Sequence, residues 1–164
     1  LRILGNLPYN ISTPLLFHLL QYQHLIADMV FMLQREVVER MAAQPGSGAY
    51  GRLSVMMQYH CKVELLFTVP ASAFTPAPKV ESAIVKLTPW RPLPYPARNS
   101  KIFASVVRTA FNQRRKTIRN TLKNLLDPEQ LQQLDIDLTL RPENLALADY
   151  VRISDMIDQQ SELT

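Results

Sequence analysis

The sequence predicts an α/β fold, namely the second half of a doubly wound sheet followed by a small all-helical domain. Three observations support this prediction. Short apolar strands alternate with amphipathic helices in the first part of the chain. A polar stretch with three prolines, at 91–99, then has the composition of a linker. From Ser100 onward the apolar residues recur at helical spacing, so we divide the chain into 1–97 and 98–164.

The elements of the first part are expected in a fixed order. Leu1–Leu4 has the pattern of the end of a buried strand that Gly5 interrupts, and Ser12 or Thr13 is expected to cap the helix that follows. The fully apolar run 28–33 is typical of a strand in the middle of a parallel sheet. The other expected elements are helices at 34–43 and 51–61 and strands at 62–69 and 81–89, the last two close enough to form an antiparallel hairpin at one edge.

Composition excludes several classes of protein. Of the 164 residues, 47% are hydrophobic, which is enough for a substantial core, and no apolar run is long enough to span a membrane. The only cysteine, Cys61, has no partner for an internal disulfide. We therefore expect a soluble, cytoplasmic protein. His18, His24 and His60 share no ligand spacing with one another or with the cysteine, so we expect no metal site.

The net charge of +4 hides a strong segregation along the chain. Residues 98–124 contain eight basic side chains and no acidic one, whereas residues 125–164 contain nine acidic and two basic side chains. A positive block within a nearly balanced chain indicates a local contact with a polyanion.

Glycine is scarce where an α/β nucleotide-binding sheet needs it. Such a sheet carries a glycine-rich loop after its first strand. This chain has only four glycines, at 5, 46, 48 and 51, and no G-x-G pattern between a strand and a helix. We infer that the sequence is the C-terminal part of a longer protein, and we expect these 164 residues alone to be inactive.

The turn GNLPYNIS, residues 5–12, combines groups that suit a planar heterocycle with an exocyclic amine. Asn6 offers hydrogen-bond acceptors and donors, and Pro8 fixes the backbone around Leu7. Tyr9 supplies a flat face for stacking. A turn after a sheet strand lies where open α/β proteins bind ligands. The same residues are equally compatible with an Asn-capped turn whose tyrosine packs in the core.

Four stretches together resemble one known family. NLPYNIS at 6–12 is similar to the N-L-P-Y signature of methyltransferases that act on amino groups. YGRLSVM at 50–56, FTPAPKVESAIV at 74–85 and FNQRRKTIRN at 111–120 are similar to further stretches of the same family, in the same order. Taken together, they resemble the KsgA-type 16S rRNA adenine N6-dimethyltransferases over essentially the whole chain.

This resemblance implies a Rossmann-like methyltransferase that uses S-adenosylmethionine. It implies methylation of N6 of two adjacent adenosines near the 3′ end of 16S rRNA, with a role in small-subunit maturation. By this resemblance Asn6 and the Leu7–Pro8 backbone hold the amine hydrogens, and Tyr9 stacks on the flipped adenine. Asn6 is also the one candidate for a cofactor contact. Phe74 resembles the second aromatic wall of the base pocket, although a loop anchor buried under the sheet is an equal alternative.

The basic block is the expected RNA-binding surface. Arg115, Arg119 and Lys123 fall at successive i, i+4 spacings of a predicted helix, and like charges at this spacing are unfavourable unless a polyanion neutralises them. The complete set of predicted RNA contacts is Arg114, Arg115, Lys116, Arg119, Lys123 and, in the Pro-rich loop, Lys79. The alternative is a solvated helical face.

Two other functions are alternatives to the methyltransferase. A non-catalytic RNA-binding or ribosome-assembly factor that retains the fold has no need of the Asn6–Tyr9 turn. A DNA amino-methyltransferase is disfavoured by the helical tail. The expected partner is therefore 16S rRNA in the small ribosomal subunit, and the expected state is a monomer.

Overall fold

Packing divides the protein into two compact units. The computed structural model describes residues 1–163. The sheet unit comprises Leu1–Ala43 and His60–Leu93, and the helical unit comprises Gln44–Tyr59 and the chain from Pro94 onward. The division into domains at residue 97 stays a prediction. The compact units differ from it because 44–59 packs with the C-terminal helices.

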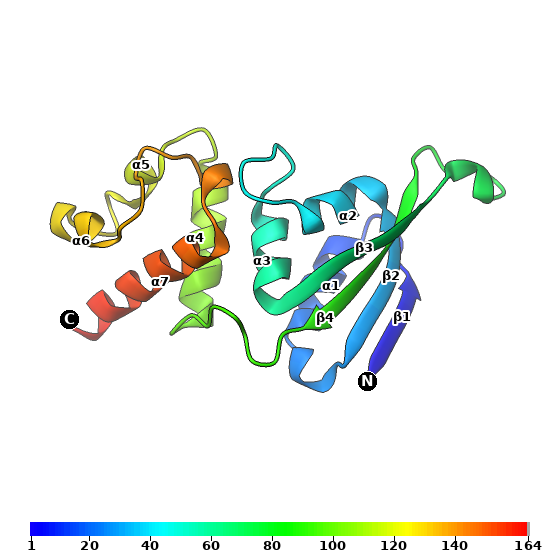
Figure 1. The fold of residues 1–164 in the computed structure, drawn as a ribbon, viewed down its shortest axis with the longest axis horizontal. Coiled ribbons are helices and arrows are strands. Elements are labelled where there is room, and N and C mark those ends of the chain that lie inside the picture. The colour runs from blue at the N-terminus through cyan, green and yellow to red at the C-terminus, as the bar shows by residue number, and fades with distance from the viewer. Residues whose placement is uncertain (164) are drawn as a thin grey trace. The chain divides into compact units, whose positions relative to one another are not determined.

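The sheet unit contains four strands in the order β1-β2-β4-β3 (Figure 1). Each expected strand and helix of this unit is present, with ends within a few residues of those predicted. The elements are β1 (Arg2–Asn6), α1 (Ser12–Leu20), η1 (Gln23–Leu25), β2 (Asp28–Gln34), α2 (Arg35–Ala42), β3 (Cys61–Val69), η2 (Ala71–Ala73) and β4 (Ser82–Pro89).

The strand directions make the sheet mixed. β1 and β2 are parallel, whereas β4 runs antiparallel to both β2 and β3. The hairpin of the last two strands is confirmed, and β3 forms the edge. The expectation that 28–33 lies inside a parallel sheet holds for its pairing with β1 but is wrong for its other neighbour. That neighbour is β4, which lies between β2 and β3 and runs antiparallel to both. After Asp28 the run is apolar because β2 is a central strand, whichever direction its neighbours take.

The two faces of the sheet differ in burial. On one face Met29, Phe31 and Leu33 of β2 are almost completely buried, as are their neighbours on β4. The helix α2 packs against β2, β3 and β4, and α1 and α2 lie behind the sheet in Figure 1. Met32, on the opposite face, is half-buried. This alternation fixes the register and therefore decides which side chains reach the end of the sheet.

Two details at the start of the chain differ from the expectation. β1 continues through Gly5 to Asn6, so the strand ends inside the quoted turn. α1 has no side-chain cap at its N-terminus, and Ser12 is its first residue. The Ser12 hydroxyl donates instead to the Tyr9 carbonyl oxygen at 3.2 Å, because the tight turn brings that carbonyl within reach.

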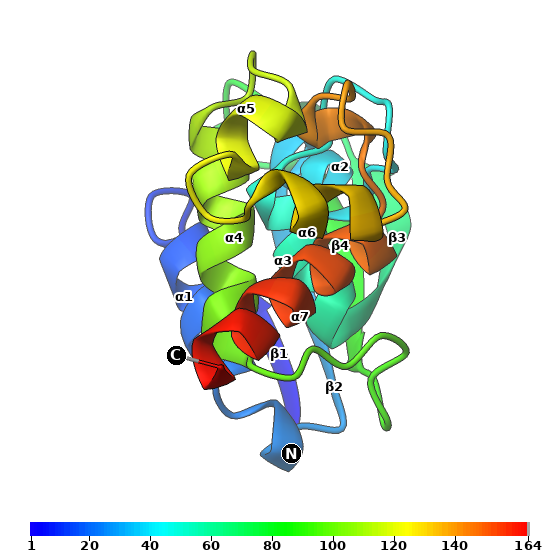
Figure 2. The same cartoon turned by 90° about the vertical axis from the view of Figure 1, so that its left-hand side faces the viewer.

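The helical unit is built mainly from α4 and α7, which pack against each other (Figure 2). The Asn99 side chain caps α4 by accepting hydrogen bonds from the backbone N–H groups of Lys101 and Ile102. The elements are α3 (Arg52–His60), whose last residue belongs to the sheet unit, α4 (Ser100–Asn112), α5 (Ile118–Leu122), α6 (Pro128–Gln133), η3 (Pro142–Asn144) and α7 (Leu147–Glu162).

A buried tyrosine, Tyr50, ties residues 44–59 to the C-terminal part of this unit, where a second buried tyrosine, Tyr150, lies. Tyr50 donates to the Leu145 carbonyl oxygen at 2.8 Å, and Tyr150 donates to the Pro142 carbonyl oxygen at 2.6 Å. Burial raises the pKa of both phenols, so both remain protonated donors at neutral pH. The Phe111 ring contacts both tyrosine rings. These contacts explain why 44–59 follows the helical unit in packing.

The predicted continuous helix through the basic block is wrong. α4 ends at Asn112, and α5 begins only at Ile118. Thr117 caps α5 by accepting a hydrogen bond from the Asn120 N–H. A threonine in this capping conformation stops the helix from continuing back to α4. Arg115 therefore lies in a connection and does not share a helical face with Arg119 and Lys123.

In the part of the chain that the structure describes, no helix has the length and apolar character needed to cross a membrane. No cluster of three or more His, Cys, Asp or Glu side chains suited to a metal ion occurs within residues 1–163.

Candidate active site

The predicted turn leaves the sheet at the end of β1. Asn6 is the last residue of this strand and pairs in register with Met32 of β2. The Leu7 N–H extends the pairing by one residue, because it donates to the Met32 carbonyl oxygen at 3.3 Å. The turn closes when the Ile11 N–H donates to the Pro8 carbonyl oxygen at 3.2 Å. The backbone of the turn is therefore anchored at both ends.

The Pro-rich loop between β3 and β4 arrives at the same end of the sheet. Because β4 is antiparallel to β2, its first residue, Ser82, pairs with the last residue of β2, Gln34. The Arg35 N–H donates to the Glu81 carbonyl oxygen at 3.0 Å, and the Arg35 guanidinium binds the Glu81 carboxylate at 2.6 Å. These bonds fix the end of the loop beside the turn.

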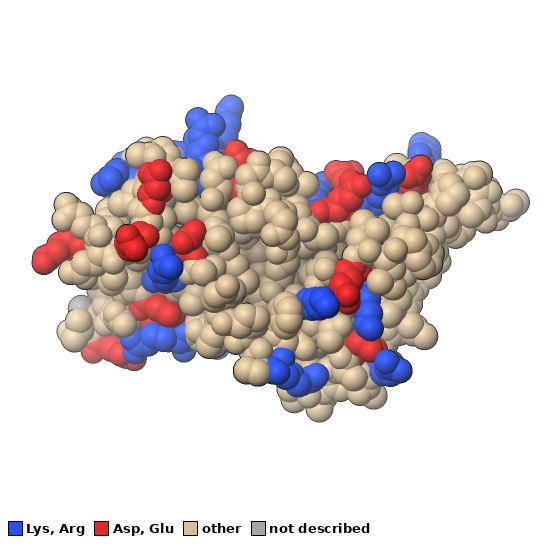
Figure 3. Space-filling view, in the orientation of Figure 1, with Lys and Arg blue, Asp and Glu red and all other residues tan. Residues whose placement is uncertain are grey.

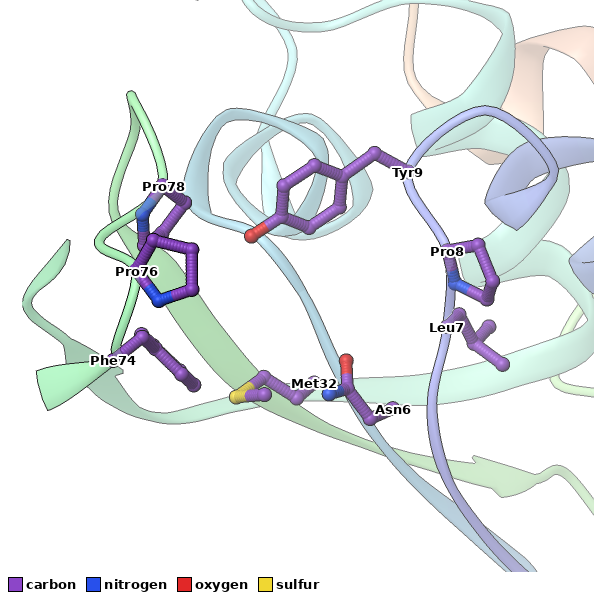
Figure 4. Close-up of a pocket in the computed structure, with 8 residues that line it drawn as sticks. All are labelled: Asn6, Leu7, Pro8, Tyr9, Met32, Phe74, Pro76 and Pro78. Atoms are coloured by element: carbon purple, nitrogen blue, oxygen red, sulfur yellow. The ribbon is translucent and has the colours of Figure 1, made fainter.

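The turn and the loop enclose a pocket of about 270 Å³ in the sheet unit (Figure 4). The Tyr9 ring lies across from Phe74, and the Asn6 carboxamide points into the space between them. Tyr9 is 39% exposed, so the alternative that it packs in the core is wrong. Phe74 is half-buried. The lining residues are Asn6, Leu7, Pro8, Tyr9, Met32, Phe74, Pro76 and Pro78.

Two hydrogen-bond acceptors of this pocket are free. The Asn6 carboxamide makes no hydrogen bond with any residue that the structure describes, and neither does the Leu7 carbonyl oxygen. The Pro8 carbonyl oxygen already accepts from Ile11. Of the groups predicted to hold an amine, Asn6 and Leu7 therefore offer unused acceptors. The lining contains no carboxylate and no cation.

Ser82 is a residue of the site that sequence reasoning missed. Its hydroxyl lies 2.9 Å from the Tyr9 phenol oxygen, and either group can donate. Ser82 is completely buried, so this hydrogen bond sets where the end of the Tyr9 ring lies. The sequence gives no local signal for a contact between residues 73 positions apart.

Met32 is the second residue that was missed. Its side chain lies at the bottom of the pocket in Figure 4, near Asn6 and Phe74. The alternation along β2 places it on the half-buried face, which is the only sequence signal for its position. A thioether is flexible and polarisable, so it accommodates the edge of a planar ring.

Two reactive side chains of the sheet unit lie outside this pocket. Burial raises the pKa of the Cys61 thiol to about 12 and lowers the pKa of the His60 imidazole to about 4. At neutral pH both groups are therefore neutral. A thiolate nucleophile at Cys61 is excluded by this burial.

The predicted RNA-binding residues fall into two structural classes. Arg114 is engaged inside the helical unit. Its guanidinium donates to the carbonyl oxygens of Gly48 and Tyr50, both at 2.9 Å, and binds the Glu143 carboxylate at 3.0 Å. The others are exposed and make no ion pair with any residue up to position 163; they are Arg115, Lys116, Arg119, Lys123 and, in the sheet unit, Lys79.

The charges on the surface of the helical unit agree with this division of the basic residues. Figure 3 shows basic side chains gathered along the upper edge above the connection between α4 and α5, whereas the visible surface over α6 and α7 carries both signs. The RNA-binding role of these residues stays a prediction.

Comparison with known proteins settles the family. The family model described as ribosomal RNA adenine dimethylase matches residues 1–159. The chain belongs to this family. The resemblance inferred from the four sequence stretches is thereby confirmed.

Curated members of the family are similar to this chain along nearly its whole length. A ribosomal RNA small subunit methyltransferase A from Pseudomonas aeruginosa is 61% identical over 157 residues, which are 96% of this chain and 59% of the relative. The protein of that name from Marinobacter nauticus is 60% identical over 163 residues, 99% of this chain and 59% of the relative. The chain thus spans about three fifths of the length of the relatives it matches.

Solved structures confirm the expected fold. A dimethyladenosine transferase from Plasmodium falciparum superposes with a TM-score of 0.81 at 30% identity, over 93% of this chain and 64% of that protein. The 23S rRNA methyltransferase ErmE superposes with a TM-score of 0.71 at 21% identity, over 96% of this chain and 65% of that protein. The second similarity supports the fold alone.

Proposed function

We propose that this chain carries the adenine-holding and RNA-binding parts of an S-adenosylmethionine-dependent rRNA adenine N6-dimethyltransferase. The substrate is a pair of adjacent adenosines near the 3′ end of 16S rRNA in the small ribosomal subunit, and the protein acts as a cytoplasmic monomer. The observation that supports this proposal most strongly is the pocket that Leu7 helps to line, in which the Asn6 carboxamide points into the space between the Tyr9 and Phe74 rings.

The chemistry of the pocket fits an adenine amine. The N6 nitrogen is a poor nucleophile because its lone pair is delocalised into the ring. When Asn6 Oδ1 and the Leu7 carbonyl oxygen accept its two hydrogens, the nitrogen is held in a geometry that frees the lone pair. Tyr9 and Phe74 stack on the two faces of the flipped base. A pocket without a charged side chain favours such a neutral base over a phosphate.

The cofactor meets this chain at one residue. S-adenosylmethionine supplies, when bound, a methyl group on a positively charged sulfur. Asn6 is the residue of this chain that would contact it, because its carboxamide projects from the end of a sheet strand with free donors and acceptors. The carboxamide also holds the nucleophile, so methyl donor and amine are positioned by the same side chain.

RNA binding rests on the unpaired cations. Arg115, Lys116, Arg119 and Lys123 are exposed in the helical unit without ion partners up to residue 163, and Lys79 is exposed on the loop that forms one wall of the pocket. Cations without partners gain from releasing the counterions of RNA phosphates. Arg114 supports the segment from inside, since its Nη2 group is bonded to Gly48, Tyr50 and Glu143.

The decisive experiment replaces the amide that faces the pocket. In the full-length protein, Asn6→Ala is expected to lower the rate of methyl transfer to unmethylated small subunits by about 100-fold or more, because misplacing a reacting group has that cost. Binding to the subunits is expected to remain within about twofold, because the phosphate contacts that dominate affinity are untouched. Transfer is measured with radiolabelled S-adenosylmethionine.

Asn10→Ala is the matched control. Asn10 is the other asparagine of the turn, is exposed, and does not line the pocket. It should retain methyl transfer. If Asn6→Ala transfers methyl groups as fast as Asn10→Ala, the catalytic proposal fails, and the non-catalytic RNA-binding factor becomes the better description.

A further inference from the structure

A second hollow lies within the helical unit and plays no part in the proposed chemistry. It has a volume of about 410 Å³ and is formed by α4, α5 with the turn that follows it, and the last turns of α7. This volume is within the range of small-molecule sites, about 300–1,000 Å³. Val106 and Leu125 supply an apolar part of its wall, and Leu125 is 40% exposed. We refer to this hollow as the α4–α7 groove.

Four polar side chains of the groove have unused hydrogen-bonding groups. They are Ser105, Thr109, Gln113 and Asn124, and none of these side chains bonds to any residue within the described range. Two other lining hydroxyls are used locally, because Thr121 donates to Thr117 and Ser161 donates to Ile157. Two hydroxyls and two carboxamides offer donors and acceptors without charge. Such a set of groups is suited to form hydrogen bonds with the edge of a neutral polar heterocycle.

The rim of the groove beside Ser105 is positively charged. Lys101 lies one turn before Ser105 on α4 and Arg108 lies three residues after it, so both are surface neighbours of Ser105. Both are exposed and make no ion pair with the residues described up to 163. The acids Asp158 and Glu162 of α7 are already paired with Arg98.

We propose that the α4–α7 groove binds an unstacked nucleotide of the rRNA substrate. The base lies against Val106 and Leu125, its edge bonds to Gln113 and Asn124, and the flanking phosphates lie on Lys101 and Arg108. Sequence-specific recognition of RNA targets splayed-out bases in loops and at ends, where the edges of the bases are free to form hydrogen bonds with side chains. This inference rests on the proposed function, because it requires the protein to bind rRNA. It adds a base-reading site to the charged surface.

The test separates the base contacts from the phosphate contacts. Gln113→Ala/Asn124→Ala removes two uncharged donors and acceptors, whereas Lys101→Ala/Arg108→Ala removes two charges. Each is made in the full-length protein, with Gln159→Ala, an exposed glutamine of α7 outside the groove, as control. Dissociation constants are measured by filter binding at several salt concentrations, for a naked transcript of the 16S rRNA 3′ region and for intact small subunits.

We expect the amide variant to bind both ligands about 30-fold more weakly with the same dependence on salt, since each of the two lost base contacts weakens binding about fivefold or more. The charge variant should reduce the slope of log affinity against log salt by about 0.7–0.9 per lost contact. Gln159→Ala should match the wild type. Lys101 and Arg108 are exposed, so the second variant keeps the test valid if the first fails to fold.

Two outcomes overturn the inference while leaving the proposed function intact. In the first, both variants bind within about twofold of a wild type that itself binds and methylates subunits. In the second, binding to intact subunits is lost but binding to the naked transcript is not, which assigns the groove to a ribosomal protein. A wild type that binds neither RNA nor subunits would instead refute the proposed function.

Discussion

The pocket at the end of β1 and the segment 113–123 of the helical unit hold their polar groups in opposite ways. In the pocket, the Tyr9 phenol is bonded to Ser82 and the Leu7 N–H to Met32, so the free acceptors stand on a fixed frame. In the segment, the exposed cations Arg115, Lys116, Arg119 and Lys123 make no ion pair within residues 1–163. Fixed groups suit chemistry, which depends on position, whereas free charges suit affinity, which depends on counterion release. Arg114 is the exception within 113–123, because its guanidinium is held by hydrogen bonds and an ion pair, as the groups of the pocket are held.

Arg114→Ala gives the largest expected effect that tests this contrast. It removes donors from two carbonyl oxygens and from a half-buried carboxylate, so we expect the free energy of unfolding to fall by about 1.5–3 kcal/mol. Chemical denaturation of the full-length protein measures the loss. Arg141→Ala, an exposed arginine of the same unit without an ion pair up to residue 163, should have little effect. If Arg114 instead binds RNA, its replacement flattens the salt dependence of binding and spares stability.

Arg115→Ala/Lys116→Ala tests the free charges of the same connection. We expect about tenfold weaker binding to small subunits at physiological salt and a smaller salt slope, by about 0.7–0.9 per lost phosphate contact. The melting temperature should not change, because neither side chain has a partner in the described chain. Filter binding across a salt series measures the slope, with Arg141→Ala again as the control. An unchanged slope would contradict the assignment of this segment to RNA.

Ser82→Ala tests the other half of the comparison, the fixed polar groups of the pocket. Losing one neutral hydrogen bond to Tyr9 costs about 1 kcal/mol, so we expect methyl transfer to slow about fivefold with unchanged binding to subunits. Tyr9→Phe keeps the ring and removes the phenol oxygen. If Ser82 acts only by positioning Tyr9, the double variant Tyr9→Phe/Ser82→Ala is no slower than the slower single variant. Additive losses in kcat would show that Ser82 acts through another group.

Local patterns were sufficient for the strands and helices of the sheet unit. The largely apolar run 28–33 and the partly alternating run 81–89 predicted their strands. Burial in a sheet produces such patterns whichever strands lie beside the segment. Asn6 and Tyr9 were predicted from the turn that follows a strand together with the family resemblance, and the resemblance also predicted Phe74. The arrangement of β4 between β2 and β3 was not predicted, since strand order depends on contacts between distant residues.

Long-range contacts also explain what the sequence reasoning missed at the sites. Ser82 faces Tyr9 only because β4 is reversed, and Met32 reaches the pocket only through the register of β2 with β1. The interrupted helix at 113–117 had a local signal, because Thr117 is a good capping residue. The regular spacing of the charges outweighed that signal in the prediction, but charge spacing does not hold a helix together.

The reversal of β4 has a consequence for how this pocket diversifies. The Asn6 amide, which we propose holds the nucleophile, belongs to β1, whereas Phe74, Pro76 and Pro78 belong to a connection on the far side of β2. Insertions or exchanges in that connection therefore reshape one wall without displacing Asn6 or Leu7. Under the proposed function, such changes would alter nucleotide preference while the position of the amine acceptors stays the same.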